Sequence, residues 1–383
     1  MVVFGTRPEA IKMAPVVRAL KAREQWLDVV TCVTAQHREM LDQVLALFEV
    51  EADHDLDIMT HGQDLYDVTA RVIVGMRDVL RQEKPDAVLV HGDTTTSTAA
   101  ALAAFYEQIP VGHVEAGLRS NLRYSPFPEE MNRRLTAQLT TWHYSPTFQS
   151  RQNLLAEGVD SDGVMLTGNT AIDALLWMNG NLRHADASGT FAPERRGVLV
   201  TAHRRENFGE GIENICLAIA DLVAAHDDVE VIYPVHPNPN IKEPVHRLLG
   251  DVPRVRLIDP VDYRDFVLLM GRAHLILTDS GGVQEEAPSL GKPVLVLREC
   301  TERPEAVDAG TVSLVGTDRA AIVSTAGRLL SDDQAYGAMA QAVNPYGDGL
   351  AADRMADHLV NTLVLDPGSA RPVSWFDVAG ESS

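Results

Sequence analysis

Short apolar runs rich in β-branched residues recur along this chain, and each is followed by a stretch with the apolar periodicity of a helix. This alternation predicts parallel sheets with helices on both faces. The first series of predicted strands is Val2–Phe4, Val29–Thr34, Ala87–Val90, Val111–Val114, Trp142–Ser145 and Val164–Thr167. The second is Val198–Thr201, Val231–Pro234, Val255–Ile258, Leu275–Thr278, Val294–Leu297 and Val312–Val315.

At 383 residues the chain is too long for one ordinary hydrophobic core, since domains average roughly 150 residues. The two series therefore predict two Rossmann-like, doubly wound domains of the α/β class, facing across a cleft. The polar stretch 179–196 separates the series and is the candidate linker. The Ser-, Gly- and Pro-containing segment 366–383 is predicted to be a frayed tail.

Composition narrows the class of protein. The formal net charge of −21 argues against nucleic acid as a partner, because such a surface needs clustered Lys and Arg. The three cysteines are widely spaced, so we expect reduced residues of the core or its margin, not disulfides or a zinc site. No segment resembles a signal peptide or a membrane span, which favours a cytoplasmic enzyme with no membrane partner.

Polar clusters follow the predicted strands, where open α/β sheets bind their ligands. In the segment 278–286, Gly281 and Gly282 open a predicted helix, where backbone amides can approach a phosphate. Glu286 lies one turn further on and could accept hydrogen bonds from ribose hydroxyls. The alternative is an ordinary strand-to-helix turn capped by Ser280.

Positive charge is concentrated at two other turns. Arg7 and Lys12 lie at the start of the first predicted helix and could face a pyrophosphate, although Arg7 could instead pair with Glu9. His203 follows the first strand of the second series and precedes two arginines. A histidine in this setting is suited to acid–base work or to phosphate contact, and the alternative is a core histidine satisfied by a backbone carbonyl. The two adjacent arginines favour phosphate contact.

Three carboxylates, those of Asp93, Glu115 and Glu129, follow strands or begin a helix. Asp93 and Glu129 could simply occupy the first turns of helices, where a carboxylate is favoured by roughly 0.3–1 kcal/mol. Glu115 comes directly after a buried strand, which is a costly position unless the acid is paired or functional. We therefore expect a functional role for Glu115.

Two patterns imitate metal sites. The segment 53–57 resembles the start of a calcium loop, but Ile58 stands where the loop needs Gly. Asp160-Ser161-Asp162 resembles the Asp-x-Asp of metal-dependent sugar transferases, but its position between a helix and a strand favours a solvated loop. No metal site is predicted.

Taken together, these segments resemble the non-hydrolysing UDP-N-acetylglucosamine 2-epimerases. The likeness runs from Phe4 to about Val364, with motifs in the family's order. Its most specific pieces are FGTRPEAIK (4–12), VTAQHR (33–38), HGDTT (91–95), HVEAGLR (113–119), TAHRREN (201–207), TDSGGVQEE (278–286) and TERPE (301–305).

The resemblance implies a glycosyltransferase-B type fold and a homodimer. The implied domains are residues 1–172, joined by the last helix at about 349–365, and residues 173–348. Because family members commonly have a few residues before the position of Met1, the first strand is expected to begin upstream.

By motif position, the resemblance assigns a catalytic set and a UDP-binding set. The catalytic set is Asp93, Glu115, Glu129 and His203. The UDP-binding set is Arg7, Lys12, Phe266, Ser280, Gly281, Gly282, Glu286 and Arg303, with the backbone near Val261 meeting the uracil.

Some family members are regulated by a second, allosteric UDP-N-acetylglucosamine, and the resemblance locates that site at Gln36, His37 and His236. The best-described regulated members carry Gln at the position of Glu39 and Arg at that of Gly62. We therefore predict only weak dependence on added UDP-N-acetylglucosamine.

The residue types suit an elimination followed by a re-addition. Carbon 2 of the sugar has no neighbouring carbonyl, so its direct deprotonation would leave an unstabilised carbanion. Expelling UDP from carbon 1 while a base removes that proton gives 2-acetamidoglucal. Protonation from the opposite face and return of UDP give UDP-N-acetylmannosamine, which is also the route the resemblance implies. This route needs a base, an acid and a diphosphate cradle, but neither NAD nor a metal cofactor.

Other functions remain open at this point. A hydrolysing 2-epimerase would use the same elimination but release N-acetylmannosamine and UDP. A glycosyltransferase would need an acceptor groove, and a nucleotide-sugar-binding regulator should lack at least one of the acids. The sequence leaves open which carboxylate is the base, while the resemblance suggests that surface polysaccharide synthesis consumes the product.

Overall fold

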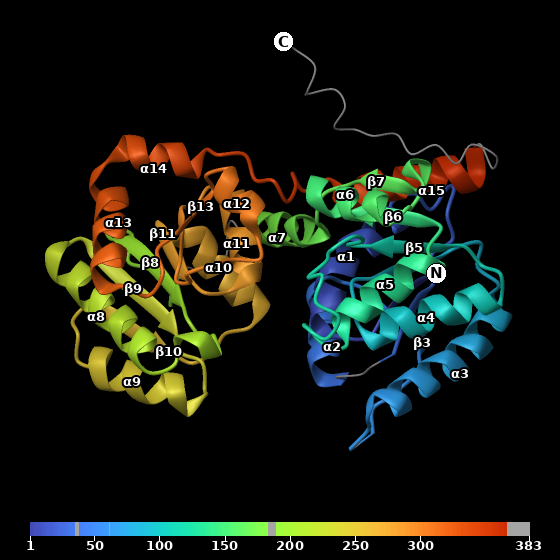
Figure 1. Ribbon diagram of the computed structural model, residues 1–383, viewed down its shortest axis with the longest axis horizontal. Helices are drawn as coiled ribbons and strands as arrows, with labels where there is room; N and C mark the ends of the chain where they lie inside the picture. The colour runs from blue at the N-terminus through green and yellow to red at the C-terminus, as the bar shows by residue number, and fades with distance from the viewer. Residues whose placement is uncertain (35–37, 61, 183–188, 366–383) are drawn as a thin grey trace, which may run out of the picture. The chain divides into compact units, whose positions relative to one another are not determined.

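The structure, a computed structural model, describes residues 1–34, 38–60, 62–182 and 189–365. The chain forms two compact units, one of Met1–Ala174 with the segment from Gly347 onward, the other of Leu175–Tyr346. Each unit is built on a parallel sheet flanked by helices (Figure 1). The predicted fold class, two Rossmann-like α/β units, is confirmed.

The sheet of the first unit has seven strands in the order β3-β2-β1-β4-β5-β6-β7. They are β1 (Val2–Phe4), β2 (Thr31–Val33), β3 (His54–Asp55), β4 (Val88–His91), β5 (Val111–Val114), β6 (Trp142–Ser145) and β7 (Val164–Leu166). The strand order reverses between β1 and β4. In doubly wound sheets this switch point is where ligands bind, beyond the carboxyl ends of the strands.

The helices of the first unit cover both faces of its sheet. They are α1 (Arg7–Lys21), α2 (Arg38–Leu47), α3 (Leu65–Glu83), α4 (Thr95–Tyr106), α5 (Glu129–Leu139), α6 (Phe148–Ala156), the start of α7 (Thr170–Asn181), and α15 (Ala351–Val360), which continues as the π-helical turn Asn361–Leu365. Helices α3, α4 and α5 pack in a row, whereas α1 packs against α2 and α15 (Figure 1). Apolar side chains of both strands and helices, such as Val3, Val90, Met76 and Ala100, are fully buried between them.

The second unit repeats this plan with six strands in the order β10-β9-β8-β11-β12-β13. They are β8 (Arg196–Thr201), β9 (Val229–Pro234), β10 (Val255–Ile258), β11 (Leu275–Thr278), β12 (Val294–Val296) and β13 (Val312–Leu314). Its helices are α8 (Glu210–Ala225), α9 (Pro239–Leu249), α10 (Tyr263–Arg272), α11 (Gly281–Glu286), α12 (Pro304–Asp308), α13 (Arg319–Ser331) and α14 (Asp333–Ala340), with short 3-10 turns at Arg205–Asn207 and Ala287–Leu290. The switch point of this sheet lies between β8 and β11.

The last helix, α15, belongs to the first unit although it follows the second in sequence. Arg23 of the turn after α1 pairs with Asp353 and Asp357 on α15, at 3.1 and 2.6 Å. On the buried side of the helix, the hydroxyl of Tyr144 and Nδ1 of His358 are 3.0 Å apart and share a hydrogen bond.

Three features differ from expectation. Strand β3 was not predicted, because its two residues are polar and no alternation marks them; its register pairs Cys32 with His54. The boundary between the units lies within α7, whereas the described part of the polar stretch 179–196 belongs to the second unit. The prediction of a core or marginal position holds for Cys32 and Cys216 but is wrong for Cys300, which is exposed beyond the end of β12.

Candidate functional site

The first turn of α1 follows β1 and is held by a buried carboxylate. Thr6 caps the helix, and Glu9 completes a capping box with the Thr6 backbone. One oxygen of Glu9 accepts hydrogen bonds from the backbone nitrogens of Gly5 and Thr6, at 3.0 and 2.8 Å. The other accepts from the hydroxyls of Thr94 and Ser97, at 2.6 and 2.9 Å. Glu9 thus joins the starts of α1 and α4 on either side of the switch point.

The two basic residues predicted for this turn have different surroundings. Arg7 is half-buried, and within the described residues it forms no ion pair with Glu9, so the structure does not favour that alternative. Lys12, one turn further along α1, forms a short ion pair with Glu115. The same Glu115 oxygen, Oε2, accepts a hydrogen bond of 3.2 Å from the side-chain amide of Asn169.

Glu115 follows β5 in a strained conformation. Its φ of 65° lies in the left-handed region, which costs a non-glycine residue about 1–3 kcal/mol unless the surroundings impose it. Its side chain is only 10% exposed. Strain at a buried acid is typical of functional sites. A functional role for Glu115 stays a prediction.

Asp93 follows the neighbouring strand β4 and has a different cationic partner. Arg133 of α5 binds its Oδ2 through Nε at 2.9 Å and Nη2 at 2.7 Å. Asn132 donates to the backbone carbonyl of Asp93 at 2.9 Å. Burial raises the pKa of Asp93, Arg133 counteracts this, and the nearby charge of Glu115 adds to the rise. Asp93 and Glu115 are therefore electrostatically coupled, yet each has its own cation.

Glu129 begins α5, on the helix face that carries Asn132 and Arg133, since residues three and four apart lie on one side of a helix. Both of those residues bond to Asp93, so Glu129 is directed toward the same region. Its Oε2 is buried and finds no hydrogen-bond partner among the described residues. The next residue, Glu130, is fully buried and accepts from the backbone nitrogen of Ser120 at 2.9 Å.

Buried histidines line three adjacent strands behind these acids. His91 ends β4, while His113 and His143 lie opposite each other on β5 and β6. Burial lowers the pKa of His91 and His143 to about 3, and that of His113 to about 4. Nε2 of His113 donates to the carbonyl of Gly92, 2.7 Å away, whereas neither ring nitrogen of His91 has a hydrogen-bond partner in the described part of the chain.

Sequence reasoning missed several residues of this region. Arg133 and Asn169 were not singled out, although Arg133 stands four residues after Glu129 and so shares its helix face. Asn169 carried no signal, because it lies far along the chain from Glu115 and meets it only through the fold.

In the second unit, Asp279 organises the loop after β8. It is fully buried at the end of β11, and its Oδ2 accepts from the backbone nitrogens of His203 and Arg204, both at 2.8 Å, and from Asn207 at 3.0 Å. Its other oxygen lies 3.8 Å from Nδ1 of His203. The imidazole of His203 is therefore held at the carboxyl edge of the sheet while its side chain stays 42% exposed.

A pocket of about 260 Å³ opens at this edge of the second sheet. Its lining includes four residues of the predicted site: His203, Val261, Phe266 and Ser280. His236, predicted for an allosteric site, lines the same pocket, and its ring centroid is 5.6 Å from that of His203. The pocket combines an apolar wall with two imidazoles, a combination suited to a ligand with a flat ring and an anionic group.

The glycine turn after β11 is packed against an arginine. A Cβ added at Gly281 would lie 2.8 Å from Cζ of Arg303, so only glycine allows this approach. Arg303 is oriented by Glu285, whose Oε1 accepts from its Nε at 2.8 Å. At Gly282 the space is open, and Glu286 ends α11 in a half-buried position. The structure thus brings Gly281 and Arg303 together, as a phosphate-binding turn would require.

Two predicted positions, Gln36 and His37, lie outside the described residues. Of the predicted allosteric set, the structure therefore places only His236.

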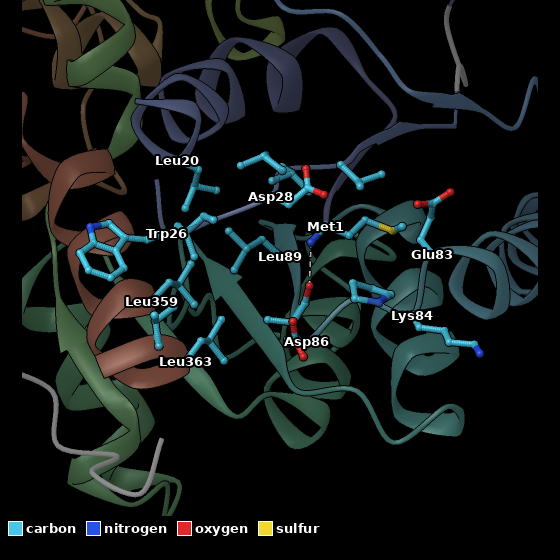
Figure 2. A pocket seen from close by; sticks show the side chains of 17 residues that line it. Met1, Leu20, Trp26, Asp28, Glu83, Lys84, Asp86, Leu89, Leu359 and Leu363 are labelled. Carbon is cyan, nitrogen blue, oxygen red and sulfur yellow. Dashed lines mark hydrogen bonds between the residues drawn. The ribbon is translucent and has the colours of Figure 1, made fainter. Parts of the chain in front are cut away.

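Another pocket of about 260 Å³ lies in the first unit, at the edge of the sheet where the strands begin, opposite the edge that carries Asp93 and Glu115 (Figure 2). Leu20, Trp26 and Leu359 line it, and the nitrogen of Met1 donates to the carbonyl of Ala87 at 2.8 Å. None of the predicted site residues borders this pocket. It belongs to the amino edge of the sheet and not to the switch point.

The described residues contain neither a membrane-spanning helix nor a cluster of metal-binding side chains. No helix there has the length and apolar character needed to cross a bilayer. Likewise, no three His, Cys, Asp or Glu side chains are grouped so as to hold a metal ion within that part of the chain.

Comparison with known proteins identifies the family. A family model described as UDP-N-acetylglucosamine 2-epimerase matches residues 18–360. The chain belongs to this family. The UDP-N-acetylglucosamine 2-epimerase of Escherichia coli K12 is 57% identical over 372 residues, which cover 95% of this chain and 99% of that protein.

Solved structures of the epimerase family share the fold. The Neisseria meningitidis UDP-N-acetylglucosamine 2-epimerase, bound to UDP-GlcNAc, is 50% identical with a TM-score of 0.88, covering 94% of this chain and 99% of that one. The Methanocaldococcus jannaschii enzyme, in complex with UDP-GlcNAc and UDP, is 33% identical with a TM-score of 0.73, covering 94% and 98%. The resemblance inferred from the sequence motifs is confirmed at the level of family and fold.

Proposed function

We propose that this chain interconverts UDP-N-acetylglucosamine and UDP-N-acetylmannosamine by eliminating UDP and adding it back. The observation that carries the proposal is the pair Asp93 and Glu115, which follow neighbouring strands and hold separate cations. Inversion at a carbon requires proton removal on one face and proton delivery on the other. Two carboxyl groups in different electrostatic surroundings are suited to these two tasks, one as the base and the other as the acid.

In the first half of the reaction, a carboxylate of the first unit removes the proton from carbon 2. The electron pair of that C–H bond forms the double bond of 2-acetamidoglucal as the bond from carbon 1 to the UDP oxygen breaks. In the second half, another carboxyl group protonates carbon 2 from the opposite face and the UDP oxygen bonds to carbon 1 again. No net oxidation takes place, so the route needs no redox cofactor.

The contacts described above support the roles that we propose for residues of the first unit. Asp93, Glu115 and Glu129 are the proton-handling groups, and Arg133 favours the ionised form of Asp93 by pairing with it, against the effect of burial. Arg7 and Lys12 are the basic residues available to a diphosphate on α1. Lys12 is shared between this role and Glu115.

In the second unit, we assign UDP to the pocket that contains Val261, Phe266 and His203. The uracil would lie against Phe266 and the backbone near Val261, and the diphosphate against Ser280, Gly281, Gly282 and Arg303. Glu286 would accept from the ribose. Positive charge and backbone amides at the phosphates stabilise the departing UDP, which is the costly part of the elimination.

A deuterium experiment tests the mechanism. In D₂O, product NMR should show one solvent deuterium at carbon 2, because the acid that delivers the new proton exchanges with water. Slow release of UDP and 2-acetamidoglucal should accompany turnover, since noncovalent contacts alone hold the intermediate. Asp93→Asn and Glu115→Gln should each lower turnover by ~10²-fold or more, whereas Asp162→Asn, at an exposed position, should not.

The same spectra separate the alternatives. Free N-acetylmannosamine accumulating with UDP would identify a hydrolysing 2-epimerase. Retention of the original carbon-2 hydrogen, with no glucal under any condition, would point to oxidation and reduction at the sugar and overturn the elimination.

Three further expectations accompany the proposal. We infer a cytoplasmic enzyme that acts as a homodimer and supplies surface polysaccharide synthesis. Sedimentation of the purified chain checks the dimer, and deletion of the gene with analysis of surface polymers checks the role.

A further inference from the structure

The side chain of His91 is a buried polar group that the proposed mechanism has not used. It ends β4, is only 4% exposed, and neither ring nitrogen has a hydrogen-bond partner among the described residues. Burying an imidazole without a partner costs free energy, and buried polar groups in folded proteins usually have a hydrogen-bond partner, so this exception calls for an explanation.

The nearest acid to this ring is Glu115. Nε2 of His91 lies 3.8 Å from Oε2 of Glu115, about 1 Å beyond a normal hydrogen bond. That oxygen is occupied by Lys12 and Asn169. A small movement of the carboxylate would therefore bring His91 into contact, provided that one of the present partners withdraws.

Of the two partners, Lys12 is the one that a bound diphosphate would attract away from Glu115. It is one of two basic residues on the first turns of α1, and a diphosphate carries more negative charge than a single carboxylate. This step rests on the proposed function, because it requires a nucleotide sugar to bind. In the absence of substrate, the ion pair with Lys12 fixes the orientation of the Glu115 carboxylate and neutralises its charge.

We propose that His91 is a positioning residue for Glu115, to which its Nε2 donates a hydrogen bond once Lys12 has turned from Glu115 to the diphosphate of the substrate.

This exchange of partners changes the strength of Glu115 as a base. An adjacent ammonium ion stabilises a carboxylate more than a neutral N–H donor does, so a base paired with Lys12 is weak. Replacing the cation by a neutral imidazole raises the proton affinity of Glu115 when substrate is present, while its orientation is kept. Burial lowers the pKa of His91 to about 3, so the ring stays neutral at neutral pH.

The charges around Glu115 come from several elements. Its ionisable neighbours are Lys12 on α1, His91 at the end of β4, Asp93 just beyond it, and His113 on β5. Among these, only the pair with Lys12 is an ion pair of opposite full charges at neutral pH. Movement of Lys12 is thus the change that most alters the proton affinity of Glu115.

The test compares two amides at position 91. In His91→Gln the amide nitrogen can reach the place of Nε2, whereas in His91→Asn it stops near that of Nδ1. We expect His91→Asn to lower kcat by about 10- to 100-fold with KM for UDP-N-acetylglucosamine within about twofold of wild type, and His91→Gln to recover most of the loss.

The pH profiles give a readout that a structural role would not move. Without the hydrogen bond, the ionised form of Glu115 in the substrate complex is less stable and its pKa rises. In the direction in which Glu115 removes the proton, the acid limb of kcat should therefore move to higher pH in His91→Asn. The acid limb of kcat/KM, which reports the free enzyme with Lys12 still paired, should stay in place.

His143→Asn is the matched control, since it removes another buried histidine of the same sheet. It should leave both limbs where they are. An unmoved kcat limb in His91→Asn, or an equal shift in His143→Asn, would overturn the proposal. If wild type itself fails to interconvert the two nucleotide sugars, the proposed function fails first, and the two failures are thereby distinguished.

Discussion

The carboxyl group of Asp93 is subject to two opposing influences. Burial favours its neutral form, and the guanidinium of Arg133 favours the ionised form. A raised pKa brings a carboxyl group closer to the pH at which it can both give and take a proton, which suits acid–base work. Arg133 thus lowers the pKa of Asp93 and also fixes the position of its carboxylate.

Replacing Arg133 should raise the pKa of Asp93. In Arg133→Met the pKa of Asp93 rises further, because Arg133 no longer opposes the effect of burial. The limb of the pH–rate profile that belongs to Asp93 should move to higher pH, whether Asp93 acts as base or as acid in the direction measured. Arg134→Met is the control, since Arg134 pairs with Glu130 and Glu157 instead. Equal profiles for both variants would remove Arg133 from this role.

At the scale of elements, Glu9 couples two helices that begin at the switch point. Its carboxylate accepts hydrogen bonds from the backbone before α1 and from two hydroxyls at the start of α4. In Glu9→Ala these buried donors lose their acceptor, so the free energy of unfolding should fall by at least about 2 kcal/mol. Urea unfolding measures the loss.

Glu49→Ala provides the comparison for that experiment. Glu49 is exposed and pairs with Arg18 at 3.6 Å, so its removal should cost less than about 1 kcal/mol. A similar small loss for Glu9→Ala would mean that the starts of α1 and α4 are held by other contacts.

At the scale of the whole molecule, buried histidines make the first unit sensitive to acid. Burial lowers the pKa of His91, His113, His143 and His358 to between about 3 and about 4. In the unfolded chain a histidine titrates near pH 6.5. The stabilisation from these neutral rings is therefore fully present above about pH 6.5 and is lost as the pH falls toward 4.

The free energy of unfolding of the first unit should accordingly fall by about 1.4 kcal/mol per pH unit for each proton that the unfolded chain takes up in this window. Urea unfolding from about pH 7.5 to 5 measures the slope. His143→Gln should make it shallower, whereas His246→Gln, at an exposed position in the second unit, should not. Identical slopes in all three proteins would contradict the assignment.

Much of the architecture follows from local sequence. Runs such as Val2–Phe4 and Leu275–Thr278 are β-branched or apolar, are buried on both faces in a parallel sheet, and were predicted with their observed bounds. The two-residue strand β3 escaped prediction, because its polar residues are held in the sheet by pairing with β2 and not by their own pattern.

The sequence by itself determined which chemical groups are available: the carboxylates Asp93, Glu115 and Glu129, the basic residues of α1, and a glycine turn. Only the tertiary structure decided their partners. Lys12 meets Glu115, Arg133 meets Asp93, and Asn169 meets Glu115 across long stretches of chain. The physical reason is that strand order in a sheet, and not distance in sequence, sets which carboxyl ends adjoin. The charge state of each acid depends on those neighbours.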